Sequence, residues 1–118
     1  MNFIKLLIFF SFGFTACNNV EVMSDKTETI SYKPTQCSEP WDETEYFANP
    51  NLSREERFKL YLKNNGIVNL LEFKNTKDDN VNCTACNCPS SDTFSFKLSQ
   101  TDYVKILTIE PFKTFFKK

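Results

Sequence analysis

The chain has 118 residues, and its 14 basic and 15 acidic residues nearly cancel to give a formal net charge of −1. It contains no histidine and only two glycines, so it lacks the commonest general base and has no glycine-rich loop to cradle a phosphate. These absences exclude most hydrolase and metalloenzyme layouts, and the balanced charge gives no electrostatic footprint for nucleic acid. We therefore expect a protein that is not an enzyme and does not bind nucleic acid.

The first residues have the pattern of a signal segment. One charge, Lys5, precedes an apolar run from Leu6 to Phe14 that is interrupted only by Ser11 and Gly13. A membrane-spanning helix needs about 20 apolar residues, and this run has about half that number. It therefore predicts a removable segment and not a membrane span.

The run leads into Phe14-Thr15-Ala16-Cys17, a bulky apolar residue and two small residues followed by a cysteine. This motif resembles the lipobox of bacterial lipoproteins. The resemblance implies that residues 1–16 are removed and that Cys17 receives a diacylglyceryl thioether, with a further acyl chain such as palmitate on the new amino end. Two alternatives remain open: an ordinary secretory signal in which Cys17 is incidental, and an anchor that is not cleaved.

The same resemblance implies a location in the cell envelope. Inner-membrane lipoproteins often carry Asp after the acylated cysteine, and this chain has Asn18, which favours the outer membrane of a Gram-negative bacterium. The polar residues 17–28 have no clear period and are interpreted as the lipidated cysteine and a tether. The expected partners are the membrane, through the lipid, and an unidentified envelope protein.

Residues 29–118 are expected to form one small domain, because about a hundred residues support a single core. Ile30 and Tyr32 alternate with polar residues, which predicts a strand over Thr29 to Lys33, before Pro34. In the loop that follows, we predict that Trp41 and Phe47 fill the core while the neighbouring acidic residues are solvated. The alternative is that Trp41 and these acidic residues form a binding surface.

The clearest helix signal lies in the middle of the chain. Ser53 and Glu56 have the spacing of a capping box, and Gly66 is the natural left-handed stop. The apolar positions between them, at helical spacing, are Phe58, Tyr61 and Leu62.

A strand is expected over Ile67 to Lys74, followed by a polar turn over Asn75 to Asn80. Near the end, alternation from Phe94 to Leu98 predicts a third strand, and the capping pattern from Ser99 to Asp102 begins a second helix that Pro111 limits. The apolar residues expected on that helix and in the tail are Tyr103, Ile106, Leu107, Phe112, Phe115 and Phe116. The whole pattern predicts an α+β fold, a small antiparallel sheet of about three strands with two helices, in the order β-α-β-(Cys loop)-β-α.

Four cysteines remain when Cys17 is set aside: Cys37, Cys83, Cys86 and Cys88. An even number in a small exported domain favours disulfides. A bridge between Cys86 and Cys88 would be strained, so we expect Cys37 to join one of them and Cys83 to take the other.

Two alternatives use the same sulfurs. Cys83-x-x-Cys86 has the spacing of a zinc knuckle, and with Cys88 and Cys37 it would offer four thiolates to Zn or Cu(I). The same pair could exchange disulfides, although it lacks the helix start that lowers a thiol pKa. With disulfides favoured, we expect no bound metal or cofactor and no catalytic residue.

Overall fold

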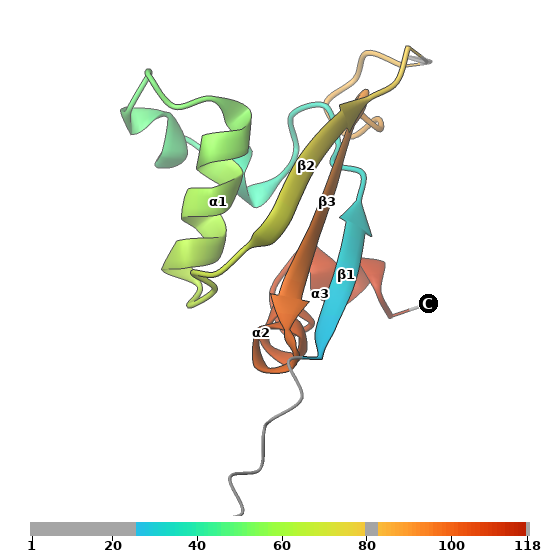
Figure 1. Cartoon of the computed structure of the whole chain (residues 1–118). Coiled ribbons are helices and arrows are strands. Elements are labelled where there is room, and N and C mark those ends of the chain that lie inside the picture. The colour runs from blue at the N-terminus through green and yellow to red at the C-terminus, as the bar shows by residue number, and fades with distance from the viewer. Residues whose placement is uncertain (1–25, 80–82, 118) are drawn as a thin grey trace, which may run out of the picture.

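The computed structural model describes residues 26–79 and 83–117, so the predicted signal segment, Cys17 and most of the tether lie outside the described residues. The fold is α+β, with a three-stranded antiparallel sheet and a few helices, as the sequence predicts. Figure 1 shows α1 beside the sheet, α2 and α3 near its lower end, and the cysteine-containing segment at the opposite end.

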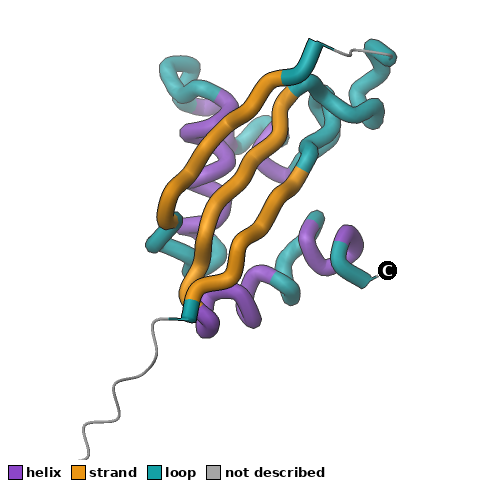
Figure 2. The backbone as a smooth tube through the Cα atoms, turned by 45° about the vertical axis from the view of Figure 1, so that its right-hand side comes forward, coloured by secondary structure: helices purple, strands orange, loops and turns teal. Residues whose placement is uncertain are grey.

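The strand β3 (Asp92–Ser99) forms the centre of the sheet, between β1 (Thr27–Tyr32) and β2 (Leu71–Lys77). Both pairings are antiparallel, with Ile30 opposite Phe96 in the first. Alternate side chains of β3 are buried, which gives the sheet one apolar face. Figure 2 shows the other face in front of α1.

The predicted strands β1 and β3 are confirmed by their burial pattern. Ile30 and Tyr32 are buried on β1, and Phe94, Phe96 and Leu98 are buried on β3. β1 begins at Thr27, two residues before the expected start of the domain, so the folded part takes in the end of the predicted tether.

The strand β2 differs from its prediction in position and in regularity. It covers Leu71–Lys77, whereas a strand from Ile67 and a turn from Asn75 were expected. Leu71 lies opposite Lys97 and Lys74 opposite Ser95, so three steps along β2 match two along β3. This extra residue is a β-bulge, and Glu72 within it has a positive φ of 50°.

The helix α1 (Arg54–Asn64) begins and ends as predicted. Ser53 Oγ accepts a hydrogen bond from the Glu56 amide at 3.2 Å, and the Glu56 carboxylate accepts one from the Ser53 amide at 2.7 Å. At the other end Gly66 has φ +85°, and the Ile67 amide donates to the Leu62 carbonyl at 2.9 Å. This is a Schellman ending, in which a left-handed glycine satisfies carbonyls of the last turn.

The second half of the chain adds α2 (Gln100–Ile106) and a short helix that was not predicted, α3 (Phe112–Phe115). Ser99 caps α2, since its Oγ accepts from the Asp102 amide at 3.2 Å. Two 3-10 turns were also not predicted, η1 (Pro40–Asp42) and η2 (Tyr46–Ala48).

The core is largely aromatic and is centred on Trp41, whose side chain is completely buried. The Trp41 ring lies 4.8 Å from the Phe58 ring and 6.5 Å from the Phe112 ring, centroid to centroid. These rings come from η1, α1 and α3, so elements that are distant in the sequence pack against one another through one group of aromatic side chains. The buried residues of the whole hydrophobic core, aromatic and aliphatic, are Ile30, Tyr32, Trp41, Phe58, Leu62, Ile67, Phe94, Phe96, Leu98, Ile106 and Phe112.

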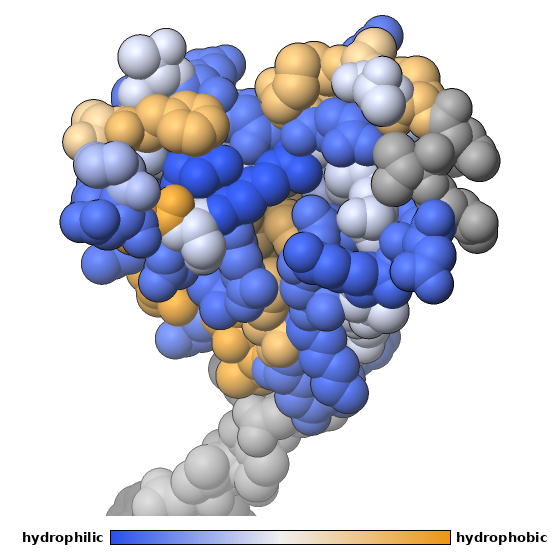
Figure 3. All heavy atoms as spheres, turned by 90° about the horizontal axis from the view of Figure 1, so that it is seen from above, coloured by the Kyte–Doolittle hydropathy of each residue, from blue (hydrophilic) through white to orange (hydrophobic). Residues whose placement is uncertain are grey.

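The surface at the upper end of the domain is mainly hydrophilic, with separate hydrophobic patches (Figure 3). In the part of the chain that the structure describes, no helix is long and apolar enough to span a bilayer.

Candidate functional site: the cysteine cluster and a pocket beside α1

The four cysteines of the domain form two disulfides. Cys37 pairs with Cys86, with Cα atoms 4.5 Å apart, and Cys83 pairs with Cys88, with Cα atoms 5.7 Å apart. This is one of the two arrangements expected from the sequence. The first bond joins residues 49 positions apart and the second closes a loop between residues five positions apart, so the two bonds constrain the chain on very different scales.

Backbone hydrogen bonds align the cysteine-containing segment with the chain that follows β1. The Gln36 amide donates to the Cys88 carbonyl at 2.7 Å, and the Cys37 amide donates to the Cys86 carbonyl at 3.1 Å. Ser90 continues the alignment, because its amide and its buried hydroxyl both donate to the Pro34 carbonyl, at 2.9 and 2.8 Å. The disulfide between Cys37 and Cys86 therefore reinforces a contact that the backbone also makes.

The pairing decides which sulfur chemistry this structure supports. All four sulfurs are in disulfides, so none is a thiolate ligand, and Cys83 and Cys86 are bonded to different partners and not to each other. Within residues 26–79 and 83–117 there is no group of three or more His, Cys, Asp or Glu side chains arranged to hold a metal ion. In its oxidised form the cluster acts as a structural cross-link.

The acidic stretch after Trp41 is divided between buried and exposed residues. Glu43 and Glu45 are exposed as predicted, but Asp42 is not solvated, with 4% of its side chain exposed. Arg54 binds it through two nitrogens, at 3.0 and 2.6 Å, and Arg57 approaches it at 3.5 Å. The prediction was wrong for Asp42 because its partners come from α1, more than ten residues later in the chain.

Trp41 and Phe47 were both predicted to fill the core. The prediction is confirmed for Trp41 and is wrong for Phe47. Phe47 is 51% exposed, and the Arg57 guanidinium lies 4.2 Å from the centre of its ring. A cation–π contact of this kind stabilises the position of an aromatic ring at the surface without burying it.

Glu39 is a buried carboxylate that was not predicted from the sequence. Only 4% of the residue is exposed, and its Oε1 accepts hydrogen bonds from the Tyr32 hydroxyl at 2.8 Å and the Thr35 amide at 2.7 Å. Burial, together with this hydrogen bond to Glu39, raises the pKa of Tyr32 far above its ordinary value. The pair connects β1 to the start of η1, and nothing in the local sequence distinguishes Glu39 from a solvated acid.

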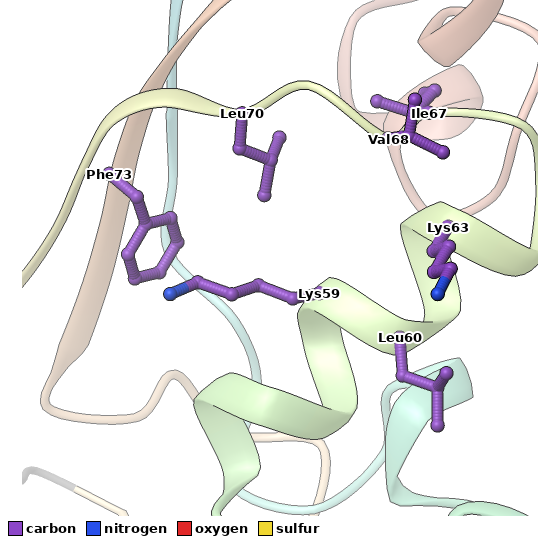
Figure 4. Close-up of a pocket in the computed structure, with 7 residues that line it drawn as sticks. All are labelled: Lys59, Leu60, Lys63, Ile67, Val68, Leu70 and Phe73. Carbon is purple, nitrogen blue, oxygen red and sulfur yellow. The ribbon is translucent and has the colours of Figure 1, made fainter.

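A pocket of about 330 Å³ lies between α1 and β2 (Figure 4). Its apolar wall comes from the segment that joins these elements, including Ile67 and Leu70, and from Phe73 on β2. Lys59 and Lys63 of α1 stand on the opposite side, and Lys59 extends toward the Phe73 ring. The site was not predicted from the sequence, where its signal is two lysines one helical turn apart, followed by a segment dense in apolar residues.

Comparison with known proteins found no matching family model, and neither a curated protein nor a solved structure matched the chain significantly.

Proposed function

We propose that the chain is an exported, lipid-anchored protein of the cell envelope, attached through Cys17 to the outer membrane of a Gram-negative bacterium. The domain beyond the tether has a non-catalytic role, in binding or in envelope structure, and two disulfides stabilise it. The main support for the proposal is the distribution of the five cysteines between the lipobox-like motif and the disulfides of the domain.

The chain has five cysteines, and four of them pair with one another inside the folded domain. Cys17 stands outside these two bonds, at the end of the lipobox-like motif. A lipobox needs a cysteine that is available for acylation, and the disulfides of the domain account for the other four. The count therefore supports acylation at Cys17 over an incidental cysteine.

The disulfides also support export. Such bonds form and persist in oxidising compartments, among them the bacterial periplasm, and are rare in the cytosol. A chain that carries a signal segment and folds with two disulfides has the two properties expected of a periplasmic or surface-exposed domain.

The non-catalytic role rests on composition and on the site. A chain without histidine has no imidazole base to activate its serines, and the buried acids Glu39 and Asp42 are engaged by structural partners. These contacts stabilise the fold and do not poise an acid–base pair.

The test is the intact mass of the protein after expression of the whole chain, with its own leader, in a Gram-negative host. We expect the membrane fraction to contain residues 17–118 with attached acyl groups, lighter by four hydrogens than the fully reduced form. Cys17→Ser should abolish incorporation of a labelled fatty acid, because the serine hydroxyl cannot form the thioether.

The double variant Cys83→Ser, Cys88→Ser is the matched control. It should keep the acyl groups and differ from its reduced form by two hydrogens only. Fatty-acid label that persists in Cys17→Ser would contradict the lipid anchor. Four alkylatable thiols in the native protein would instead contradict the disulfides and redirect the search to thiolate metal binding.

A further inference from the structure

The pocket beside α1 is a partly open depression lined by apolar side chains and two lysines, and its size is suited to a small ligand. Small-molecule pockets usually have volumes of about 300–1,000 Å³, so a pocket of about 330 Å³ is at the lower end of that range. Ile67 in its lining is almost completely buried, while Leu70 and Phe73 are half-buried and available for contact. The size excludes an intact phospholipid and favours a short hydrocarbon body.

The other side of the pocket carries positive charge. Lys59 and Lys63 are four residues apart in α1, so they lie one turn apart on the same helix face. The Lys59 ammonium is 4.4 Å from the centre of the Phe73 ring and 3.2 Å from a Glu55 oxygen. Lys63 is exposed and forms no ion pair with any described residue, which leaves its charge available to an anion.

The bulge in β2 contributes to this arrangement. Glu72 has a positive φ, which is uncommon for a residue with a side chain, and such bulges are frequent beside binding sites because they redirect side chains. The Glu72 carboxylate pairs at 2.8 Å with Lys97, which alternates with the buried residues of β3 and so belongs to the opposite face of the sheet. The bulge thus directs this negative charge away from the pocket.

We propose that this pocket binds a small amphipathic carboxylate with a short hydrocarbon chain. The carboxylate pairs with the Lys63 ammonium, assisted by Lys59, and the hydrocarbon chain packs against Leu70 and Phe73. The proposal gives the binding role a ligand class and rests on that part of the proposed function. It does not depend on acylation of Cys17.

The test is a titration of the whole chain, in phospholipid nanodiscs, with hexanoate, followed by amide chemical shifts in nuclear magnetic resonance. We expect saturable shifts confined to residues 59–73, with a dissociation constant of about 1 mM for so small a ligand. Lys63→Gln, which removes the charge and leaves a polar side chain one atom shorter, should weaken binding about fivefold, the upper range for an exposed ion pair. Lys113→Gln on α3 is the matched control and should not change the affinity.

Hexylamine is the control ligand, because it has nearly the same hydrocarbon chain as hexanoate and the opposite charge. It should bind more weakly if the lysines recognise the carboxylate. No saturable shifts at residues 59–73, equal shifts with hexylamine, or an unchanged dissociation constant in Lys63→Gln would each overturn the proposal. The titration can be made on acylated or unacylated chain, so a negative result here is distinguishable from a failure of the lipid anchor.

Discussion

The hydrogen bond between Tyr32 and Glu39 shows how one buried acid is accommodated in a small core. Glu39 would be costly to bury alone, and the Tyr32 hydroxyl and the Thr35 amide both donate to its Oε1. The phenol is itself buried, so it resists ionisation. Both groups therefore depend on the same contact.

Tyr32→Phe should reduce the free energy of unfolding by about 1–3 kcal/mol at pH 7, because the buried Glu39 loses one of its donors. It should also change the response to alkali. The pKa of Tyr32 is raised in the folded state, so the unfolded chain releases this proton first and stability is lost as the pH rises above about 10. The phenylalanine variant lacks this contribution, so its stability should fall less steeply between pH 9 and pH 11.

Urea unfolding across that pH range measures both effects. Tyr103→Phe, at a half-buried tyrosine of α2, is the matched control for removing a phenol hydroxyl from another element. Parallel profiles for Tyr32→Phe and the wild type would contradict the assigned role of Tyr32.

At the scale of single elements, sequence predicts best where the determinants are local. The bounds of α1 follow from Ser53, Glu56 and Gly66, all within or beside the helix, and the structure confirms each. The bulge in β2 has no such local determinant. It depends on the register with β3, and because of it Leu71 is 46% exposed although its spacing matches that of the half-buried Phe73.

In the candidate site, too, features with local determinants could be predicted and features that depend on distant residues could not. The sequence predicts that the four domain cysteines pair and limits the pairing to two arrangements, because spacing alone disfavours a bond between Cys86 and Cys88. It could not place Asp42 or Phe47, since their partners Arg54 and Arg57 reach them only after α1 folds against η1. The pocket was harder still to predict from the sequence, because it exists only once α1 and the bulged β2 are both in place.

The capping box of α1 permits a prediction for the whole element. Ser53→Ala should reduce the free energy of unfolding by about 1 kcal/mol, since the Glu56 amide loses its acceptor. Hydrogen bonds from the backbone amide of Ser53, and to a smaller extent from its hydroxyl, hold the pKa of the Glu56 carboxyl below its ordinary value. The variant removes only the hydroxyl, so it should raise that pKa part of the way toward normal. A lowered carboxyl pKa contributes stability above the unfolded pKa of about 4.3 that is lost as the pH falls.

A carboxyl titration by nuclear magnetic resonance follows Glu56 directly, and urea unfolding gives the stability. Ser99→Ala, which removes the cap of the shorter α2, is the comparison: it should lower stability but leave the titration of Glu56 unchanged. An unaltered Glu56 titration in Ser53→Ala would mean that the backbone amide of residue 53 alone lowers the pKa, and would contradict a contribution from the Ser53 hydroxyl.

For the molecule as a whole, the disulfides compensate for a small core. The described domain has fewer than a hundred residues, and domains of this size have little stability to spare. The bond between Cys37 and Cys86 connects the segment after β1 to the segment before β3. It holds the chain that leaves β1 next to the chain that enters β3, at one end of the sheet.

The two disulfides should differ in how much they stabilise the fold, because a cross-link lowers the entropy of the unfolded chain more when it closes a longer loop. For a separation of 49 residues the chain-entropy relation gives about 4 kcal/mol, and for a separation of five it gives about 2 kcal/mol. We therefore expect Cys37→Ala, Cys86→Ala to lower the free energy of unfolding about twice as much as Cys83→Ala, Cys88→Ala. Urea unfolding of the two double variants tests this, and each serves as the control for the other. Equal losses would mean that the unfolded chain is already compact around the cysteine segment, so that the long loop carries no extra entropy to remove.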